Sequence, residues 1–149
     1  MRAVVQRVKN ASVCVEQKIC GKIEKGILLL LGIASDDNEK DLEYIVNKVI
    51  NIRIFPNDQG LMDQSLKQVN GEILIISQFT LYGDARKGRR PSYSEAASGN
   101  LATGLYNKAI DLFKNEIQIV QQGVFGAMMD VSLLNWGPVT ILLDSGKKF

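Results

Sequence analysis

The chain has 149 residues, of which 46% are hydrophobic and 23% charged, and its formal net charge is +2. These values are typical of one folded globular domain over residues 1–149, and they exclude both a disordered chain and a protein that attracts nucleic acid by overall charge alone. Cys14 and Cys20 are the only cysteines and histidine is absent, which excludes a zinc site and a disulfide framework. No metal ligand and no cofactor is therefore predicted.

The N-terminal segment predicts a cytoplasmic location. Arg7 and Lys9 interrupt what would be the apolar core of a secretion signal, and the residues around them alternate as in a strand. The longest apolar run, Ile27 to Leu31, is far shorter than the roughly 20 residues that cross a membrane. We therefore expect reduced cysteines, as in the cytosol, and no membrane partner.

Extended segments dominate the first third of the chain. Strands are predicted at residues 2–8, 12–15, 19–23 and 26–33. The first two are separated by a turn at residues 9–11, and the last two by a turn at residues 24–26. The run ILLLLGI in the fourth strand has no polar face, which predicts a central strand that is buried on both sides.

A helix is predicted to follow, up to about Asn51. The segment Asp36 to Glu39 offers a capping residue with an acid three positions further on. The apolar residues then fall on one helical stripe: Leu42, Ile45, Val46, Val49 and Ile50. A short extended piece at residues 53–55 ends at Pro56 and a turn at residues 57–60.

The second half adds one long helix and further strands. We expect a strand from Ile73 to Phe79, a basic loop at residues 82–92, a short helix capped by Ser92 and Glu95, a helix from Leu101 to Asn115, and strands near 117–121, 128–134 and 139–143. The fold class is then α/β, a single domain with a mixed or largely antiparallel, barrel-like sheet covered by two long helices.

The absence of histidine limits the available chemistry. Catalytic arrangements that need Ser-His-Asp, Cys-His or a histidine-bound metal are excluded. A hydroxyl nucleophile would need Lys, Asp, Glu or the substrate itself as its base. Any hydrolysis has to depend on positioning and on backbone or hydroxyl donors.

Polar residues end the strand that begins at Ile73. In the stretch SQFTLYGD, the strand turns polar at Ser77, Gln78 and Thr80 before a Gly-Asp loop. If the strand continues, Gln78 and Thr80 share one face and Ser77 and Phe79 the other. Sites are often placed at the polar end of a buried strand, but the pattern alone favours a simpler explanation, in which these groups satisfy strand-end backbone groups and Phe79 packs in the core.

Four cations follow within five residues: Arg86, Lys87, Arg89 and Arg90. Because Arg forks match phosphate oxygens, the run indicates phosphate binding, and a solvated loop is the equal alternative. Tyr82 and Tyr93 flank the run and could stack on a base, but the pattern favours edge packing for both.

Two glycine-containing stretches near the C-terminus have a local explanation and a functional one. GVFGAMM, from Gly123 to Met129, reads as a bend or bulge and matches neither a dinucleotide fingerprint nor a P-loop. In NWGPVT, composition alone favours a tight turn at Gly137-Pro138. Alternatively, glycine lets a ligand approach the backbone closely, and proline allows a cis bond.

Together these stretches resemble the D-aminoacyl-tRNA deacylase family, first described as D-tyrosyl-tRNA deacylases. The matching stretches appear in the family's order over nearly the whole chain: MRAVVQRVKNASV, GILLLLGI, RIFPNDQGLMDQS, SQFTLYGD, GRRPSYSEAAS, GVFGAMM and NWGPVT. The resemblance implies a homodimer that hydrolyses the ester between a D-amino acid and tRNA. It also implies that Gly137-Pro138 is cis and reaches into the partner's active site as a chiral filter, which excludes an L side chain but admits a D side chain or glycine.

The resemblance also implies roles for single residues. Ser77, Gln78, Phe79 and Thr80 would be the catalytic residues that line the pocket for the terminal adenosine and aminoacyl group. Further substrate-pocket residues would be Phe125, Ala127, Met128 and Asn135, and Arg86, Lys87, Arg89 and Arg90 would bind tRNA. Two positions depart from the family's pattern, in which the places of Met128 and Trp136 are usually acidic; either change could alter substrate preference.

The resemblance leaves two mechanisms open: Thr80 is the nucleophile, or the terminal 2′-hydroxyl of the tRNA assists hydrolysis while the protein only positions the ester. Without an evident base for Thr80, we expect it to act as a hydrogen-bond donor. Two other functions remain open: an RNA-binding module without catalysis, and a Thr80-dependent hydrolase of small esters or amides.

Overall fold

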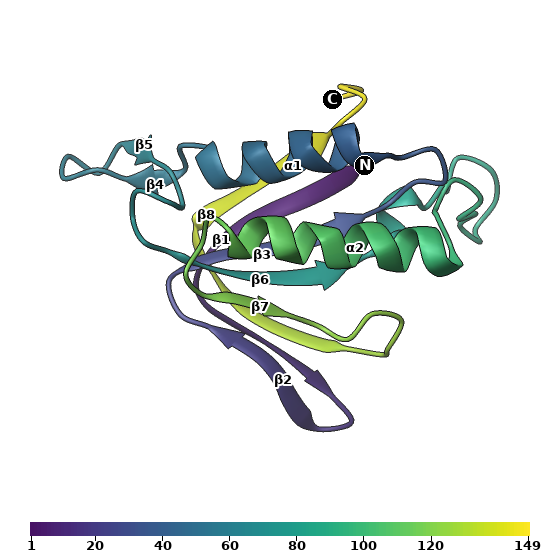
Figure 1. Ribbon diagram of the computed structural model, residues 1–149, viewed down its shortest axis with the longest axis horizontal. Helices are drawn as coiled ribbons and strands as arrows, with labels where there is room; N and C mark the ends of the chain where they lie inside the picture. The colour runs from purple at the N-terminus through teal and green to yellow at the C-terminus, as the bar shows by residue number, and fades with distance from the viewer.

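The computed structural model describes residues 1–149. Eight strands, two α-helices and one 3-10 helix follow one another (Figure 1): β1 (Arg2–Val15), β2 (Lys18–Ile23), β3 (Gly26–Gly32), α1 (Glu39–Asn51), β4 (Phe55–Pro56), β5 (Met62–Gln64), β6 (Glu72–Ser77), η1 (Phe79–Tyr82), α2 (Gly99–Lys114), β7 (Val120–Gln122) and β8 (Asp130–Asp144). No helix is both long and apolar enough to cross a membrane.

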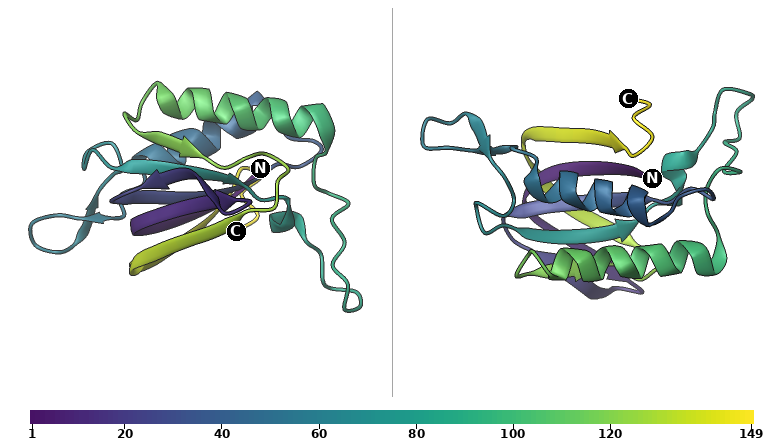
Figure 2. Two further views of the ribbon diagram at one scale, coloured as in Figure 1. Left: turned by 90° about the horizontal axis from the view of Figure 1, so that it is seen from below. Right: turned by 45° about the horizontal axis from the view of Figure 1, so that its top comes forward.

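Six strands form one mixed sheet, in the order β2-β1-β3-β6-β7, with β8 added on β1. The pairs β3–β6 and β6–β7 are parallel, and the others are antiparallel. The sheet curls until β2 meets β7 (Figure 2): a Cβ on Gly21 would lie 3.0 Å from the carbonyl oxygen of Gln122. The predicted single α/β domain with a barrel-like mixed sheet is confirmed.

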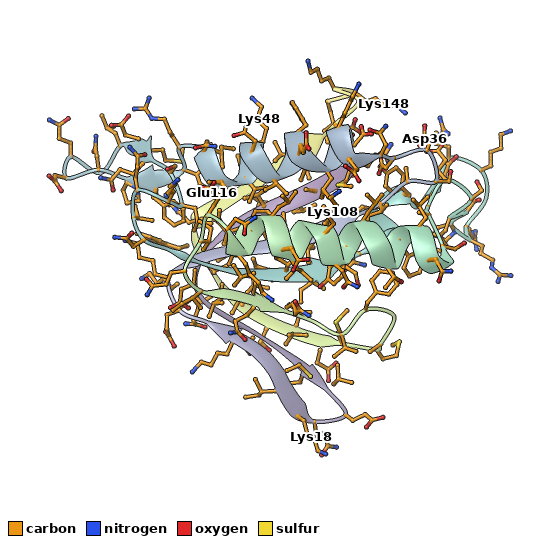
Figure 3. The ribbon with its side chains drawn as sticks, in the orientation of Figure 1. Lys18, Asp36, Lys48, Lys108, Glu116 and Lys148 are labelled. Atoms are coloured by element: carbon orange, nitrogen blue, oxygen red, sulfur yellow. The ribbon has the colours of Figure 1, made fainter.

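Helices α1 and α2 lie side by side on the outer face of this sheet (Figure 1). Asn38 caps α1, and its side chain and that of Asp41 form the reciprocal bonds of a capping box. Lys108 of α2 forms an ion pair with Glu39 of α1 at 2.5 Å. The charged side chain of Lys48 on α1 points outward, away from the sheet (Figure 3). The apolar faces of both helices are thereby left to the core.

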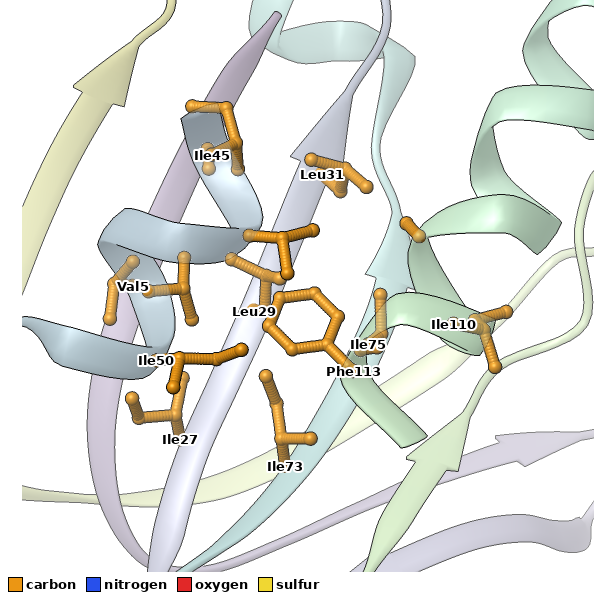
Figure 4. Close-up of a cluster of buried hydrophobic side chains, with 14 of the residues drawn as sticks. Val5, Ile27, Leu29, Leu31, Ile45, Ile50, Ile73, Ile75, Ile110 and Phe113 are labelled. Atoms are coloured by element: carbon orange, nitrogen blue, oxygen red, sulfur yellow. The ribbon is translucent and has the colours of Figure 1, made fainter. Parts of the chain in front are cut away.

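Two clusters of buried side chains fill the two sides of the sheet. Alternate residues of β3 and β6, such as Ile27, Leu29, Ile73 and Ile75, pack beneath the helices with Phe113 (Figure 4). The residues between them, including Leu28, Leu74 and Ile76, point to the inside of the barrel. The central strand predicted from ILLLLGI is therefore confirmed as buried on both faces, as expected for a strand with parallel pairing.

Two predicted breaks in strands do not exist. β1 runs without a turn through residues 9–11, because it pairs with β8 along nearly its whole length and absorbs the irregularity as shifts of register. β8 likewise runs through Gly137-Pro138, so the two strands predicted at 128–134 and 139–143 are one. The prediction of a tight turn at Gly137-Pro138, which composition alone favoured, was therefore wrong.

Three other boundaries were also predicted wrongly. The strand predicted to reach Phe79 ends at Ser77, because β3 ends at Gly32 and offers no further partner. Ser92 caps no helix; its backbone pairs with Asp84 instead. The strand expected at 117–121 is β7, which begins at Val120.

Candidate active site

A pocket of about 660 Å³ opens beyond the end of β6. Its walls are residues 76–80, residues 96–99 and Ala102 at the start of α2, and residues 125–129, completed by Leu31, Ile33, Tyr93 and Val131. None of these side chains carries a charge, and Tyr93 is the only ionisable one. The pocket is thus apolar with a few hydrogen-bonding groups, as is usual for sites that bind organic ligands.

The polar strand end lies at this pocket, although its geometry differs from the prediction. Ser77, Gln78, Phe79 and Thr80 all line it. Because η1 starts at Phe79, the alternation of a strand does not apply, and the shared face predicted for Gln78 and Thr80 was wrong. A hydrogen bond from the Gln78 amide to the Thr80 hydroxyl brings the two side chains together instead. The pocket lining includes no carboxylate or amine that could act as a base for that hydroxyl.

The stretch 123–129 forms the opposite wall and includes Phe125, Ala127 and Met128. Tyr106 of α2 supports this wall: its hydroxyl donates to the Ile75 carbonyl at 2.8 Å, and its ring lies 5.5 Å from that of Phe125. Burial raises the pKa of Tyr106 to about 12. Met128 is 92% exposed, so its side chain lies at the rim and not in the floor.

Arg2 holds η1 from the side away from the pocket, and no sequence signal singled it out. Its guanidinium donates to the Leu81 carbonyl at 2.9 Å and lies 4.5 Å from the centre of the Tyr82 ring. Asp144, at the end of β8, accepts from the Arg2 Nε at 3.2 Å. Burial, followed by the charge of Asp37, raises the pKa of Tyr82 above its usual range. The turn that bears Thr80 is therefore fixed by a neutral, buried phenol and a paired cation.

The basic loop leaves from η1 and projects from the body of the protein (Figure 2). Arg86 is paired within the loop: its Nε and Nη2 both donate to the Asp84 carboxylate at 2.8 Å, and its side chain is 83% exposed. This contact lowers the pKa of Asp84 and raises that of Arg86. Lys87, Arg89 and Arg90 form no ion pair.

Gly137 and Pro138 lie in a bulge of β8 and do not line the pocket of their own chain. Gln6 pairs with Thr140 and Val8 with Asn135, so Arg7 alone lies opposite residues 136–139. The Gly137-Pro138 peptide bond is cis. Asn135, expected in the pocket, spans the bulge instead: it accepts from the Val139 amide and donates to the Thr140 hydroxyl, both at 3.0 Å.

Arg7 fixes this bulge to the rest of the domain. Its side chain is buried and donates to the carbonyls of Trp136, at 2.8 Å, and of Ile54. Its guanidinium also lies 4.6 Å from the centre of the Trp136 ring, whose other contacts are with Lys25 and Phe55. Trp136 therefore packs inward, and Gly137 and Pro138 remain exposed. Burial lowers the pKa of Arg7, although a guanidinium remains charged.

Nowhere in the chain do three Cys, Asp or Glu side chains come together as a metal site would require. The class of site is thus an uncharged pocket with hydroxyl and amide groups on its wall, next to a cationic loop, in an α/β barrel. Comparison with known proteins identifies the family: residues 4–144 match the D-Tyr-tRNA(Tyr) deacylase family, and the chain belongs to it.

Individual relatives agree along the whole chain. Proteins named D-aminoacyl-tRNA deacylase from Thermosipho africanus (strain TCF52B) and Clostridium acetobutylicum (strain ATCC 824) are 58% and 56% identical over 149 residues, covering 100% of both chains in each case. Among solved structures, the c-Myc DNA unwinding element binding protein is 41% identical with a TM-score of 0.91, over 97% of this chain and 98% of that one. A probable eukaryotic D-amino acid tRNA deacylase shares the fold, with a TM-score of 0.84 at 18% identity over 96% and 98% of the two chains.

Proposed function

We propose that this protein is a D-aminoacyl-tRNA deacylase, a cytoplasmic hydrolase that releases D-amino acids from tRNA. Family membership and relatives of that name along the whole chain support the reaction. The site supports it too, because an uncharged pocket suits an adenosine with an aminoacyl group, and Lys87, Arg89 and Arg90 suit the phosphates that follow. Glycine has no side chain for the filter to exclude, so glycyl-tRNA would also be a substrate.

The observation on which the mechanism rests is the absence of a base at Thr80. Gln78 is the only side chain bonded to its hydroxyl, and the pocket has no charged group. We infer that a water oxygen attacks the ester carbonyl, the carbon–oxygen bond to the ribose breaks, and the ribose oxygen leaves as a hydroxyl. The neighbouring 2′-hydroxyl of the substrate assists the proton transfer, and Thr80 donates a hydrogen bond and positions the ester.

Chirality is read, in this proposal, by the backbone of Gly137-Pro138 from a second copy of the chain. Within one chain the dipeptide and the pocket are separate, so a complete site needs a partner. β8 also has a free outer edge, on which Leu133, Leu134 and Leu142 are 38–57% exposed. An apolar, unpaired edge of this kind favours pairing with another chain. The active form would be a homodimer.

The experiment for the function is release of D-tyrosine and L-tyrosine from charged tRNA, with free D-tyrosine ethyl ester as the control. Rapid release of only the D-enantiomer from tRNA is expected. Equal rates on both enantiomers would contradict the filter. Tight tRNA binding without release would favour an RNA-binding module. Turnover of the free ester would favour a small-ester hydrolase.

The dimer has its own experiment, in which two inactive variants are mixed. Gly137→Ala disables the filter and Ala127→Trp fills the pocket. If each site combines a pocket from one chain and a filter from the other, a mixed dimer contains one site with both defects and one intact site. Unfolding and refolding an equal mixture should restore about a quarter of the wild-type activity, by random pairing in a two-fold dimer. No recovery in a confirmed mixed dimer would contradict the cross-subunit arrangement.

A further inference from the structure

Two aromatic rings form the part of the pocket rim from which the basic loop leaves. Phe79 precedes the loop and Tyr93 follows it, and both line the pocket. Their ring centroids are 5.0 Å apart at an interplanar angle of 70°, and the residues are 55% and 39% exposed. Gly83 allows this arrangement, because a Cβ there would lie 3.1 Å from Tyr93 Cε1. An edge-to-face pair leaves ring faces free for another planar group.

The basic loop beyond this pair is held together at its two ends by backbone hydrogen bonds, and only one of its four cations is paired with a carboxylate. The amide of Asp84 donates to the Ser92 carbonyl at 2.8 Å, and that of Ser92 to the Asp84 carbonyl at 2.9 Å. Asp84 also neutralises Arg86. Lys87, Arg89 and Arg90 are exposed, form no ion pair and do not line the pocket, so the loop offers three free cations outside it.

We propose that the Phe79–Tyr93 pair is a stacking platform for the base that immediately precedes the terminal adenosine in the single-stranded 3′ end of tRNA, with Lys87, Arg89 and Arg90 binding the phosphates further along. The proposal rests on the proposed function. A pocket of about 660 Å³ suits one small organic ligand, here the terminal nucleoside with its aminoacyl group, so the preceding nucleotide has to cross the rim. Aromatic faces followed by cations are the combination that single strands require.

The platform would recognise strandedness and not base identity, since every base presents a face that can stack. A base that is paired within a duplex is not free to lie on the rim. The enzyme should therefore accept any base before the terminal adenosine but reject a 3′ end that is annealed to a complementary strand.

Tyr93→Leu tests the platform, because it keeps apolar volume but removes the aromatic face; Tyr93→Phe is the matched control. Two substrates are compared: D-tyrosyl-tRNA and D-tyrosyl-adenosine, which ends at the terminal nucleoside. On the tRNA, Tyr93→Leu should raise KM about 5- to 150-fold, the range for loss of one stacked base, while Tyr93→Phe changes it little. On D-tyrosyl-adenosine the two variants should differ far less.

Equal losses on both substrates would overturn the platform and leave Tyr93 as a pocket wall. Failure of the proposed function would look different, because the wild-type protein would then release D-tyrosine from neither substrate.

The cations are tested by the salt dependence of KM on D-tyrosyl-tRNA. Replacing Lys87, Arg89 and Arg90 together by Gln should flatten the slope of log KM against log salt by about 0.7 for each phosphate that the protein no longer neutralises. The matched control is the pair Asp84→Asn with Arg86→Gln, which leaves the net charge unchanged and should keep the wild-type slope. An unchanged slope in the triple variant, or an equal change in the control, would overturn the role of these cations.

Discussion

The pocket and the bulge of β8 are built in opposite ways. The pocket is concave, its wall comes from separate segments of the chain, and it has no charged side chain. The bulge is exposed at Gly137 and Pro138, and it is held from behind by the buried cation of Arg7 and the amide of Asn135. One region offers space without a means to read chirality, and the other offers rigid backbone without space. In the proposed dimer, each chain would therefore contribute a pocket to one site and a bulge to the other.

Gly137→Ala should produce the largest effect. The new Cβ would lie 2.7 Å from Arg7 Nη2 and 2.8 Å from Val139 Cγ2. The backbone φ of +133° is also one that residues other than glycine rarely adopt. The bulge has to move, and a displacement of about 1 Å near reacting groups can cost about a hundredfold in rate. We expect a loss of that size in kcat/KM on D-tyrosyl-tRNA, with an unchanged circular dichroism spectrum. Unchanged turnover and selectivity would reduce the bulge to a structural feature.

Arg7→Lys should weaken the link between the bulge and the domain. Lysine cannot reproduce the fork that reaches the carbonyls of Trp136 and Ile54, and bonds from charged donors contribute about 1.5–3 kcal/mol each. A loss of about 2–3 kcal/mol in the free energy of unfolding is expected from urea titration, together with reduced selectivity. Arg53→Lys is the control, since its side chain is 64% exposed. Equal effects of the two changes would argue against a special role for Arg7.

Thr80→Ala tests the pocket half with a smaller expected effect. If Thr80 only donates a hydrogen bond, its loss should cost about 1–1.5 kcal/mol, which is roughly a tenfold drop in kcat/KM at most. Single-turnover kinetics with D-tyrosyl-tRNA would measure this. Complete loss of turnover in the variant, with an acyl-Thr80 adduct detected by mass spectrometry in the wild type, would make Thr80 the nucleophile.

Tyr106→Phe should have the smallest effect at neutral pH and a distinct one in alkali. The hydroxyl bond to Ile75 contributes about 1 kcal/mol. Because burial raises the pKa of Tyr106 to about 12, above the unfolded value near 10, its contribution is complete below pH 10 and is lost as the pH rises towards 12. Between pH 10 and 12 the free energy of unfolding of the wild type should fall by up to about 1.4 kcal/mol per pH unit more than that of the variant. Parallel curves would show that Tyr106 does not titrate there.

The features that the sequence predicts well are those decided by local pattern. The apolar run at residues 27–31 has no polar face, so it can only be a strand that is buried on both sides. The cap of α1 depends on bonds between Asn38, Lys40 and Asp41, which are close together in the sequence. The polar strand end at residues 77–80 likewise lies at the pocket. These residues depend little on what other segments do.

What the pattern missed depends on distant partners. Nothing around Gly137 indicates that β1 continues the pairing on both sides of the bulge, so a turn was the natural expectation. Arg2, Arg7 and Tyr106 act through carbonyls 79, 129 and 31 residues away along the chain, and no local signal predicts such contacts. The expectation of a chiral filter and of a dimer depends on the family resemblance and not on the residue pattern.

Trp136 is the only tryptophan in the chain, and its indole lies within the bulge, against the guanidinium of Arg7. All indole emission of the protein therefore originates at one point beside Gly137. Steady-state fluorescence, without any label, would register a partner or a substrate that reaches this point, and a rim ligand that stays at the Phe79–Tyr93 pair of the same chain would leave the signal unaltered. The chain thus has its own fluorescent probe at the place where, in the proposed dimer, the bulge of one chain would meet the pocket of the other.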